Sequence, residues 1–273
     1  MEQIIHNLQD MTYLSWSLIR GSSGTAGSFL KSYEDTSDGK IYYKLSNYDS
    51  YRGVIGHECV NEIIADRLLS ILGIPHLSYQ LIHADILIDG QQQETWLCAS
   101  KDYKQRGDRK IALDAYYQIE RNSGESPMDF CIRNGWEKEI YQMLVFDYLI
   151  LNRDRHGANM EVLINRLQKT IRLAPLFDHG VSLLSRCPDE ASLLKENVMD
   201  DKPVQCFVGS HSAWDNLQLI PKDRYPDLNP LQDTDRSTLL EGLDEAIDPI
   251  WLESIWEMIW RRWQAYENLR NQR

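Results

Sequence analysis

The sequence has little basic charge and no long apolar run, and each shortage excludes a class of protein. Against 41 Asp and Glu residues stand only 29 Lys and Arg residues, which gives a net charge of −12. A broad nucleic-acid footprint needs clustered basic residues, so we expect no direct contact with nucleic acid. The same charge argues against docking on an anionic membrane. The longest apolar stretch, residues 143–151, contains Asp147 and is too short to span a bilayer.

Closely spaced cysteines and targeting signals are also missing. No two cysteines have the spacing of a zinc or redox motif, because the thiols are scattered at Cys59, Cys98, Cys131, Cys187 and Cys206. The N-terminal residues lack a basic segment followed by an apolar run, so we expect no signal peptide. These features favour a cytoplasmic protein with reduced thiols.

The composition that remains is that of a globular protein. Apolar residues make up 42% of the chain, eight tryptophans among them, and 26% of the residues are charged. That is enough to fill a core and cover a surface, without internal repeats or low-complexity segments. The length of 273 residues suits one large domain or two small lobes.

The first hundred residues are rich in strand signals. A Gly/Ser cluster at 21–28 leads into the segment 29–33, the first arm of a hairpin, and then into a turn at 37–39 and a strand at 41–45, which carries Lys44. The pattern predicts a Gly-rich hairpin with a lysine on its outgoing strand. A helix over 58–72 follows, stopped by Gly73 and Pro75, and then strands over 79–88 and 94–99.

Helical signals dominate beyond a polar stretch at 101–110, which we interpret as a linker between two lobes. Residues 136–151 are nearly all apolar, as in a helix that is buried on every side. A helix over 250–269 places Trp256, Trp260 and Trp263 on one face, where they should pack against the second lobe. Residues 187–230 show weak periodicity and predict a long irregular insertion near the site.

The most informative segment, residues 152–159, directly follows the buried helix. Phosphoryl transfer needs a carboxylate near the attacking hydroxyl and oxygen ligands for magnesium. Asp154 and Asn159 can supply both from one loop, and protein kinases have the same Asp-to-Asn spacing in their catalytic loop. There a histidine stands two residues before the aspartate, whereas here His156 stands two residues after it.

A second element ends in an aspartate. We predict a hairpin of residues 160–164 and 171–177, with Asp178 at the end of the returning strand and Gly180 loosening the turn. The hairpin brings Asp178 beside Asn159, and two such oxygen ligands suit magnesium. Each feature alone is also compatible with a salt-bridged loop or an ordinary turn. Their order along the chain is what indicates a kinase.

Four segments carry a resemblance to a known family: residues 22–31, 43–45, 61–74 and 152–178. Together they resemble the HipA-like serine/threonine kinases, which are the toxin kinases of bacterial toxin–antitoxin systems and their stand-alone relatives. The resemblance covers about residues 20–185, and the Asn-x-Asp-x-His-x-x-Asn pattern at 152–159 is its most specific part. It implies an α+β, two-lobed protein-kinase-like fold. Residues 1–103 would form a small β-rich lobe with one long helix, and 104–273 a larger, mostly helical lobe.

The resemblance also implies a set of roles. The cofactors would be ATP and Mg²⁺, with Asp154 as the catalytic base, His156 bracing its loop, and Asn159 and Asp178 as metal ligands. Lys44 would contact the α- and β-phosphates, held by Glu62 or, one helical turn earlier, by Glu58. The remaining nucleotide contacts would come from Ser23, Gly24, Thr25, Ala26, Gly27 and Ser28 around the phosphates, and from Ala99 and Lys101 near the adenine.

The partners implied are a protein substrate with a Ser or Thr acceptor and an antitoxin or companion small subunit. The chain leaves no room for the extra N-terminal subdomain of full-length HipA proteins, which a separate chain would supply unless this is a shorter branch. Ser28 and Phe29 replace the usual Gln of the loop, so Ser23 and Thr25 are the candidates for self-phosphorylation. Two alternatives stay open: a small-molecule kinase of the aminoglycoside or choline type, and a non-catalytic nucleotide-binding module that docks a partner.

Overall fold

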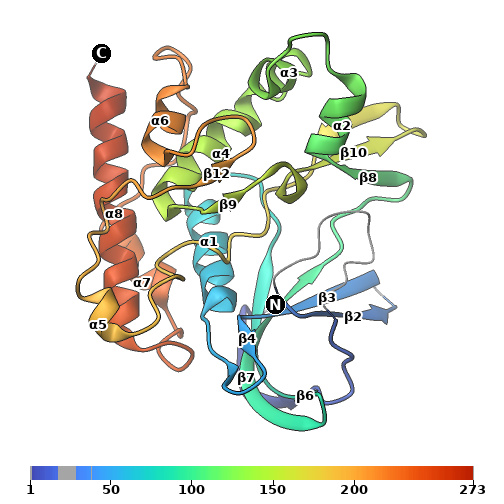
Figure 1. Cartoon of the computed structure of the whole chain (residues 1–273), viewed down its shortest axis with the longest axis vertical. Coiled ribbons are helices and arrows are strands. Elements are labelled where there is room, and N and C mark those ends of the chain that lie inside the picture. The colour runs from blue at the N-terminus through green and yellow to red at the C-terminus, as the bar shows by residue number, and fades with distance from the viewer. Residues whose placement is uncertain (1, 18–28, 38, 273) are drawn as a thin grey trace.

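A five-stranded sheet forms the first half of the molecule (Figure 1). The computed structural model describes residues 2–17, 29–37 and 39–272. Within them the strand order is β1-β6-β7-β3-β2, with β1 parallel to β6 and every other pair antiparallel. The strands are β1 (Ile4–Asp10), β6 (Tyr79–Ile88), β7 (Gln91–Lys101), β3 (Gly39–Leu45) and β2 (Lys31–Thr36).

Helix α1 (Glu58–Leu72) lies between this sheet and the helices of the second half (Figure 1). It follows a short hairpin of β4 (Tyr48–Asp49) and β5 (Gly53–Val54). Twelve of its 15 residues are buried, polar ones included, because it packs on β6 and β7 on one side and on α7 on the other. Gly73 ends the helix in the left-handed conformation, φ +73°, as its sequence position predicts.

The second half is mostly helical, with a three-stranded sheet ordered β11-β10-β8 and a short parallel pair of β9 and β12. Its strands are β8 (Asp108–Ala112), β9 (Asp154–Arg155), β10 (Glu161–Asn165), β11 (Thr170–Leu173) and β12 (Gln205–Cys206). Its helices are α2 (Leu113–Glu120), α3 (Pro127–Arg133), α4 (Glu137–Ile150), η1 (Gly157–Asn159), α5 (Glu190–Leu193), α6 (Ala213–Gln218), α7 (Asp235–Leu240) and α8 (Pro249–Asn271).

The core has two parts, one on each face of the five-stranded sheet. The larger joins α1 to α4 and α8 through side chains such as Ile63, Phe146 and Ile259. The smaller covers the opposite face, where Leu14 packs against Leu97 and other strand residues. In α4 eleven consecutive residues from Ile140 are buried, which confirms the prediction of a helix enclosed on every side.

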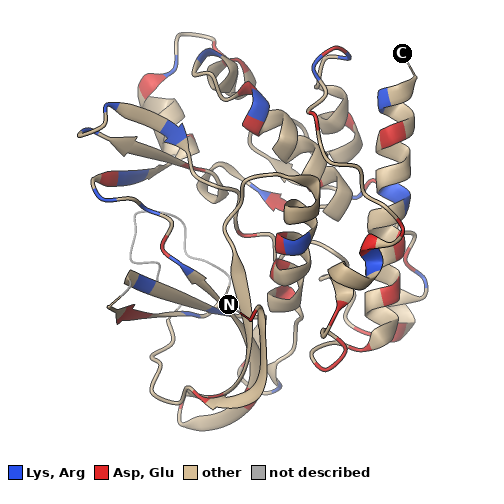
Figure 2. Cartoon of the chain, turned by 180° about the vertical axis from the view of Figure 1, so that it is seen from behind, with Lys and Arg blue, Asp and Glu red and all other residues tan. Residues whose placement is uncertain are grey.

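Helix α8 confirms the predicted packing of its tryptophans. Trp256 and Trp263 are buried against the second half, and Trp260 stacks on Trp256 with ring centroids 5.5 Å apart. Acidic and basic residues both occur along its length (Figure 2), and Arg261 pairs with Glu257. None of the described helices combines the length and apolarity that a bilayer crossing requires.

Three segments differ from the sequence-based expectation. The expected linker at 101–110 is shorter, because Lys101 belongs to β7 and residues 108–110 belong to β8, which pairs with β10. The segment 187–230 is less irregular than expected, since it contains α5, α6 and β12, and β12 pairs with β9. The strand expected to run to residue 177 ends at Leu173.

Candidate functional site

Lys44 lies at the centre of a buried ion-pair cluster. Strand β3 places it opposite Cys98 of β7, and its Nζ lies 2.9 Å from Glu62 Oε1 and 2.5 Å from Asp178 Oδ1. Burial lowers the pKa of the ammonium, but the two carboxylates outweigh this and hold the pKa well above its ordinary value. Lys44 is therefore a fixed positive charge where the sheet, helix α1 and the segment that carries Asp178 meet.

Glu62, rather than Glu58, is the partner of Lys44. Its other oxygen, Oε2, accepts a hydrogen bond of 2.9 Å from the backbone N–H of His179, so one buried carboxylate joins β3 to the segment after Asp178. Glu58 lies one turn earlier and accepts from the backbone N–H of Asn47 at 3.0 Å. Of the two alternatives from the sequence, the geometry selects Glu62.

Asp178, rather than Gly180, has the left-handed backbone conformation in this turn. Its φ is +60°, a region that side chains rarely adopt, and its N–H donates to the hydroxyl of Tyr79 at 3.2 Å. Gly180 serves a different purpose: a Cβ there would lie 3.0 Å from Glu58 Cβ and 3.2 Å from Glu58 O. The glycine lets the segment approach α1 closely, and the expectation that it loosens the turn is wrong.

Asp154 and Asn159 form the predicted loop after α4. The Asn159 side-chain N–H₂ donates to Asp154 O at 2.8 Å and to Asp154 Oδ2 at 3.3 Å. Asn152 Oδ1 accepts from the Asp154 N–H at 3.1 Å. The Asp154 side chain is 35% exposed, so its carboxylate is held by the loop yet open to a reactant. His156 Nε2 lies 3.6 Å from Asp154 Oδ1, and its Nδ1 accepts from the Ala158 N–H.

The guanidinium of Arg155 connects this loop to the segment that carries Asp178. It is 1% exposed and makes a bidentate pair with Asp147 of α4, with contacts of 2.8 and 2.9 Å. Its Nη1 also donates to the backbone carbonyls of Asn159, at 3.2 Å, and Phe177, at 3.0 Å. Arg155 thereby holds the backbone of Asn159 and of Phe177, the residue before Asp178.

The residues present fit a magnesium ion shared with phosphates. Asn159 Oδ1 is buried and has no hydrogen-bond partner among the described residues, and Asp178 adds a carboxylate. No group of three or more His, Cys, Asp or Glu residues suited to a metal occurs in the described ranges. The protein would therefore supply two oxygen ligands, with nucleotide and water supplying the others, an arrangement that magnesium favours.

The predicted nucleotide contacts divide into two groups. Ala99 and Lys101 lie on β7, where they pair with Tyr43 and Ile41 of the lysine-bearing strand. Ala99 is buried and Lys101 is exposed. The phosphate-loop residues lie outside the described residues: Ser23, Gly24, Thr25, Ala26, Gly27 and Ser28.

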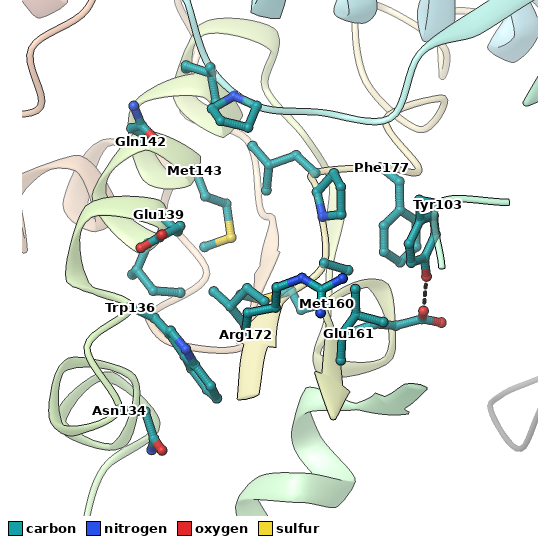
Figure 3. A pocket seen from close by; sticks show the side chains of 18 of the residues that line it. Tyr103, Asn134, Trp136, Glu139, Gln142, Met143, Met160, Glu161, Arg172 and Phe177 are labelled. Carbon is teal, nitrogen blue, oxygen red and sulfur yellow. Dashed lines mark hydrogen bonds between the residues drawn. The ribbon is translucent and has the colours of Figure 1, made fainter. Parts of the chain in front are cut away.

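A cavity of about 470 Å³ adjoins the site between α4, the β10–β11 hairpin and residues 174–177 (Figure 3). Met160 and Phe177, the neighbours of Asn159 and Asp178, line it. The Phe177 ring stacks on Tyr103, whose hydroxyl donates to Glu161.

Sequence reasoning missed the residues that hold the site together. Asp147 stood out only as a charge within an apolar run, although Arg155 follows in the motif. Asn61 was noted beside Glu62, and its side-chain N–H₂ donates to the carbonyls of Gly180 and Ser182, both at 2.9 Å. An amide in the buried stripe of a helix is the signal that could have revealed it.

Comparisons with known proteins place the fold. No family model matches the sequence, and no curated protein matches it. A crystal structure of the Helicobacter pylori proinflammatory kinase CtkA matches with a TM-score of 0.63 and 16% identity, covering 96% of this chain and 97% of that one. A chain of the Shewanella oneidensis MR-1 complex of HipA, HipB and operator DNA matches with a TM-score of 0.40 and 15% identity, over 90% of this chain and 58% of that one. The match to CtkA confirms the predicted α+β, kinase-like fold.

Proposed function

We propose that the chain is an ATP- and magnesium-dependent kinase that transfers the γ-phosphoryl group to a Ser or Thr hydroxyl of a protein, in the manner of the HipA-like kinases. Residues 1–103 would hold the nucleotide and residues 104–273 would carry the catalytic loop and the acceptor. The phosphate loop and β7, with Ala99 and Lys101, would contact the nucleotide.

One observation carries the proposal. The Lys44 ammonium contacts both Glu62 and Asp178. Arg155 joins the carbonyl of Phe177, the neighbour of Asp178, to the loop that contains Asn159. Phosphoryl transfer requires a cation that contacts the phosphates, a carboxylate that a hydroxyl can reach, and oxygen ligands for the metal ion. These residues provide all three. A module without chemistry has no need to hold all of them together.

Each residue would have a defined task. Asp154 would accept the proton of the attacking hydroxyl, while Asn159 holds its carboxylate and His156 braces the loop. Asn159 and Asp178 would bind magnesium, which neutralises the charge that develops on the transferred phosphoryl group. Lys44, kept charged by Glu62, would position the α- and β-phosphates.

The acceptor would bind beside β9. Strand β12 pairs with β9 there, with Gln205 opposite Asp154, so the segment 187–230 borders the proposed base. The HipA-like resemblance supports a protein acceptor and an antitoxin or companion small subunit, with self-phosphorylation at Ser23 or Thr25. The same surface would hold the acceptor of a small-molecule kinase, so the test must identify the product.

Two measurements test the proposal. ATP with magnesium should raise the melting temperature of the protein more than ATP with chelator, because the metal joins nucleotide to protein. Incubation with labelled ATP and magnesium, followed by mass spectrometry, should find phosphate on Ser or Thr. General-base assistance is worth about 10² to 10⁴ in rate, so Asp154→Asn should slow the transfer by that range and leave ATP binding nearly intact.

The outcomes separate the alternatives. ATP binding without transfer to any acceptor supports the non-catalytic module. Label on aminoglycoside or choline acceptors, with none on protein, supports the small-molecule kinase. Equal melting temperatures with and without ATP and magnesium contradict the proposal altogether.

A further inference from the structure

The cavity behind the catalytic loop has the size of a small-molecule site. Its volume of about 470 Å³ lies within the range of roughly 300 to 1,000 Å³ that is typical of ligand pockets. Apolar side chains form much of its wall, among them Met143, Leu173, Pro175 and Leu176. Figure 3 shows Glu139, Gln142 and Met143 of α4, with Trp136 at its N-terminal cap, on one side, and Tyr103 and Phe177 on the other.

Two polar side chains of α4 border this cavity without partners of their own. Gln142 is 4% exposed, yet its amide forms no hydrogen bond with any residue that the structure describes. Glu139, three residues earlier, is exposed and forms no ion pair within the described ranges. Residues three apart are neighbours on a helix surface, so one ligand group can reach both. The Gln142 amide is not among the fully buried polar atoms that lack a partner, so it faces open space, where a ligand in the cavity can reach it.

The charge of the cavity wall favours a cationic ligand. Arg172 is neutralised by Asp108, with its Nη2 2.6 Å from Asp108 Oδ2. Glu161 is neutralised by Lys110, 3.1 Å away, and accepts from Tyr103. The charge that remains is the carboxylate of Glu139, which repels anions. Trp136 lies one turn before it on the same helix face and offers a ring to a cation.

We propose that this cavity binds a primary amine with an apolar body, whose ammonium group lies at Glu139 and Gln142. An ammonium group has three N–H donors and no acceptor, so it can pair with the carboxylate and donate to the amide oxygen at once. The apolar body fills the space against Met143 and Leu176. Nothing in this assignment depends on phosphoryl transfer.

Three probes with a phenylalkyl body and different head groups test whether the cavity prefers a cation. They are 4-phenylbutylamine, 4-phenylbutan-1-ol and 4-phenylbutyrate, titrated into the full chain at neutral pH by calorimetry. The amine should bind saturably, one per chain, and about fivefold more tightly than the alcohol, as expected for an exposed charge pair. The acid should bind more weakly than either.

Matched variants locate the site. Glu139→Gln should abolish the preference for the amine over the alcohol. Gln142→Leu should weaken amine binding without loss of fold, because an apolar side chain replaces an unpaired amide. Glu120→Gln, an exposed change on α2 away from the cavity, should leave all three affinities unchanged. The proposal is overturned by absent saturable binding of the amine, by equal binding of the acid, or by an amine preference that persists in Glu139→Gln.

Discussion

At the level of single residues, Lys44 depends on a carboxylate that holds it in place. Glu62→Gln should keep a hydrogen bond to Lys44 Nζ but remove a negative charge from a buried pair, where the interaction between charges is strongest. If the proposed function holds, the KM for ATP should rise in Glu62→Gln. The assay is phosphoryl transfer at several ATP concentrations.

Glu58→Gln is the matched control for this change. Glu58 lies on the same helix, and a Gln oxygen can still accept from the Asn47 N–H. Its activity should stay close to that of the parent chain. A large effect of Glu58→Gln beside a silent Glu62→Gln would contradict the pairing.

The candidate site residues could be named from the sequence because they follow one another in a characteristic order. The types and spacing of Lys44, Asp154, Asn159 and Asp178 made them candidates for phosphoryl transfer. The structure places Lys44 beside Asp178 and Asn159 beside Asp154. Gly180 was misinterpreted, because a glycine can serve either a positive φ or a close approach, and the sequence does not distinguish them.

At the level of elements, Arg155 connects α4, the loop of Asp154 and the segment that carries Asp178. Arg155→Lys keeps the charge beside Asp147 but loses the planar fork that reaches two further carbonyls. We expect weaker magnesium-dependent stabilisation by ATP and a rise in the magnesium concentration needed for activity. Thermal shifts and rates over a magnesium titration measure both.

A double variant separates this role from fold maintenance. Apolar replacement of both partners of a buried ion pair is often tolerated, whereas loss of one partner is costly. Asp147→Leu with Arg155→Met should therefore keep the fold, as judged by circular dichroism, and still show the altered magnesium dependence. Normal magnesium dependence in the folded double variant would argue against the positioning role.

The elements themselves were largely predictable, but their partners were not. The bounds of α1 matched because an apolar stripe and Gly73 act locally. Strand β12 went unnoticed because two residues, Gln205 and Cys206, gain their conformation only by pairing with β9, far away in the sequence. Residues 108–110 looked like a linker for the same reason: β8 is polar, and its pairing with β10 decides its structure.

At the level of the whole molecule, the protonation of His57 makes the free energy of unfolding depend on pH. His57 lies at the start of α1, with its ring 4.8 Å from that of Trp251 of α8 and its Nε2 3.4 Å from Leu183 O. Burial lowers the pKa of His57 to about 4, below its ordinary 6.5, and the hydrogen bond to Leu183 opposes this only in part. As the pH falls, the unfolded chain protonates His57 before the folded chain does. The contribution of His57 to the free energy of unfolding is therefore fully present above pH 6.5 and is lost as the pH drops towards 4.

Acidification from pH 7.5 to 5 should therefore cost up to about 2 kcal/mol of unfolding free energy through this group. Urea unfolding at the two pH values measures the loss in the parent chain. His57→Gln has no proton to gain, so its loss should be smaller by about the same amount. Equal losses in the two proteins would show that His57 is not the group responsible.

The larger core is built from segments that are far apart in the sequence and are therefore synthesised at different times. Residues of α1, such as Ile63 and Leu68, share one core with Ile255 and Ile259 of α8, and β1 pairs with β6. On the ribosome α1 emerges long before α7 and α8, at about 5 to 20 residues per second, so the side of α1 that faces away from the sheet stays uncovered for seconds. The nascent chain cannot complete its core until α8 is free. A shielding chaperone would therefore matter most in that interval, when the sheet is already made but its helix still lacks a cover.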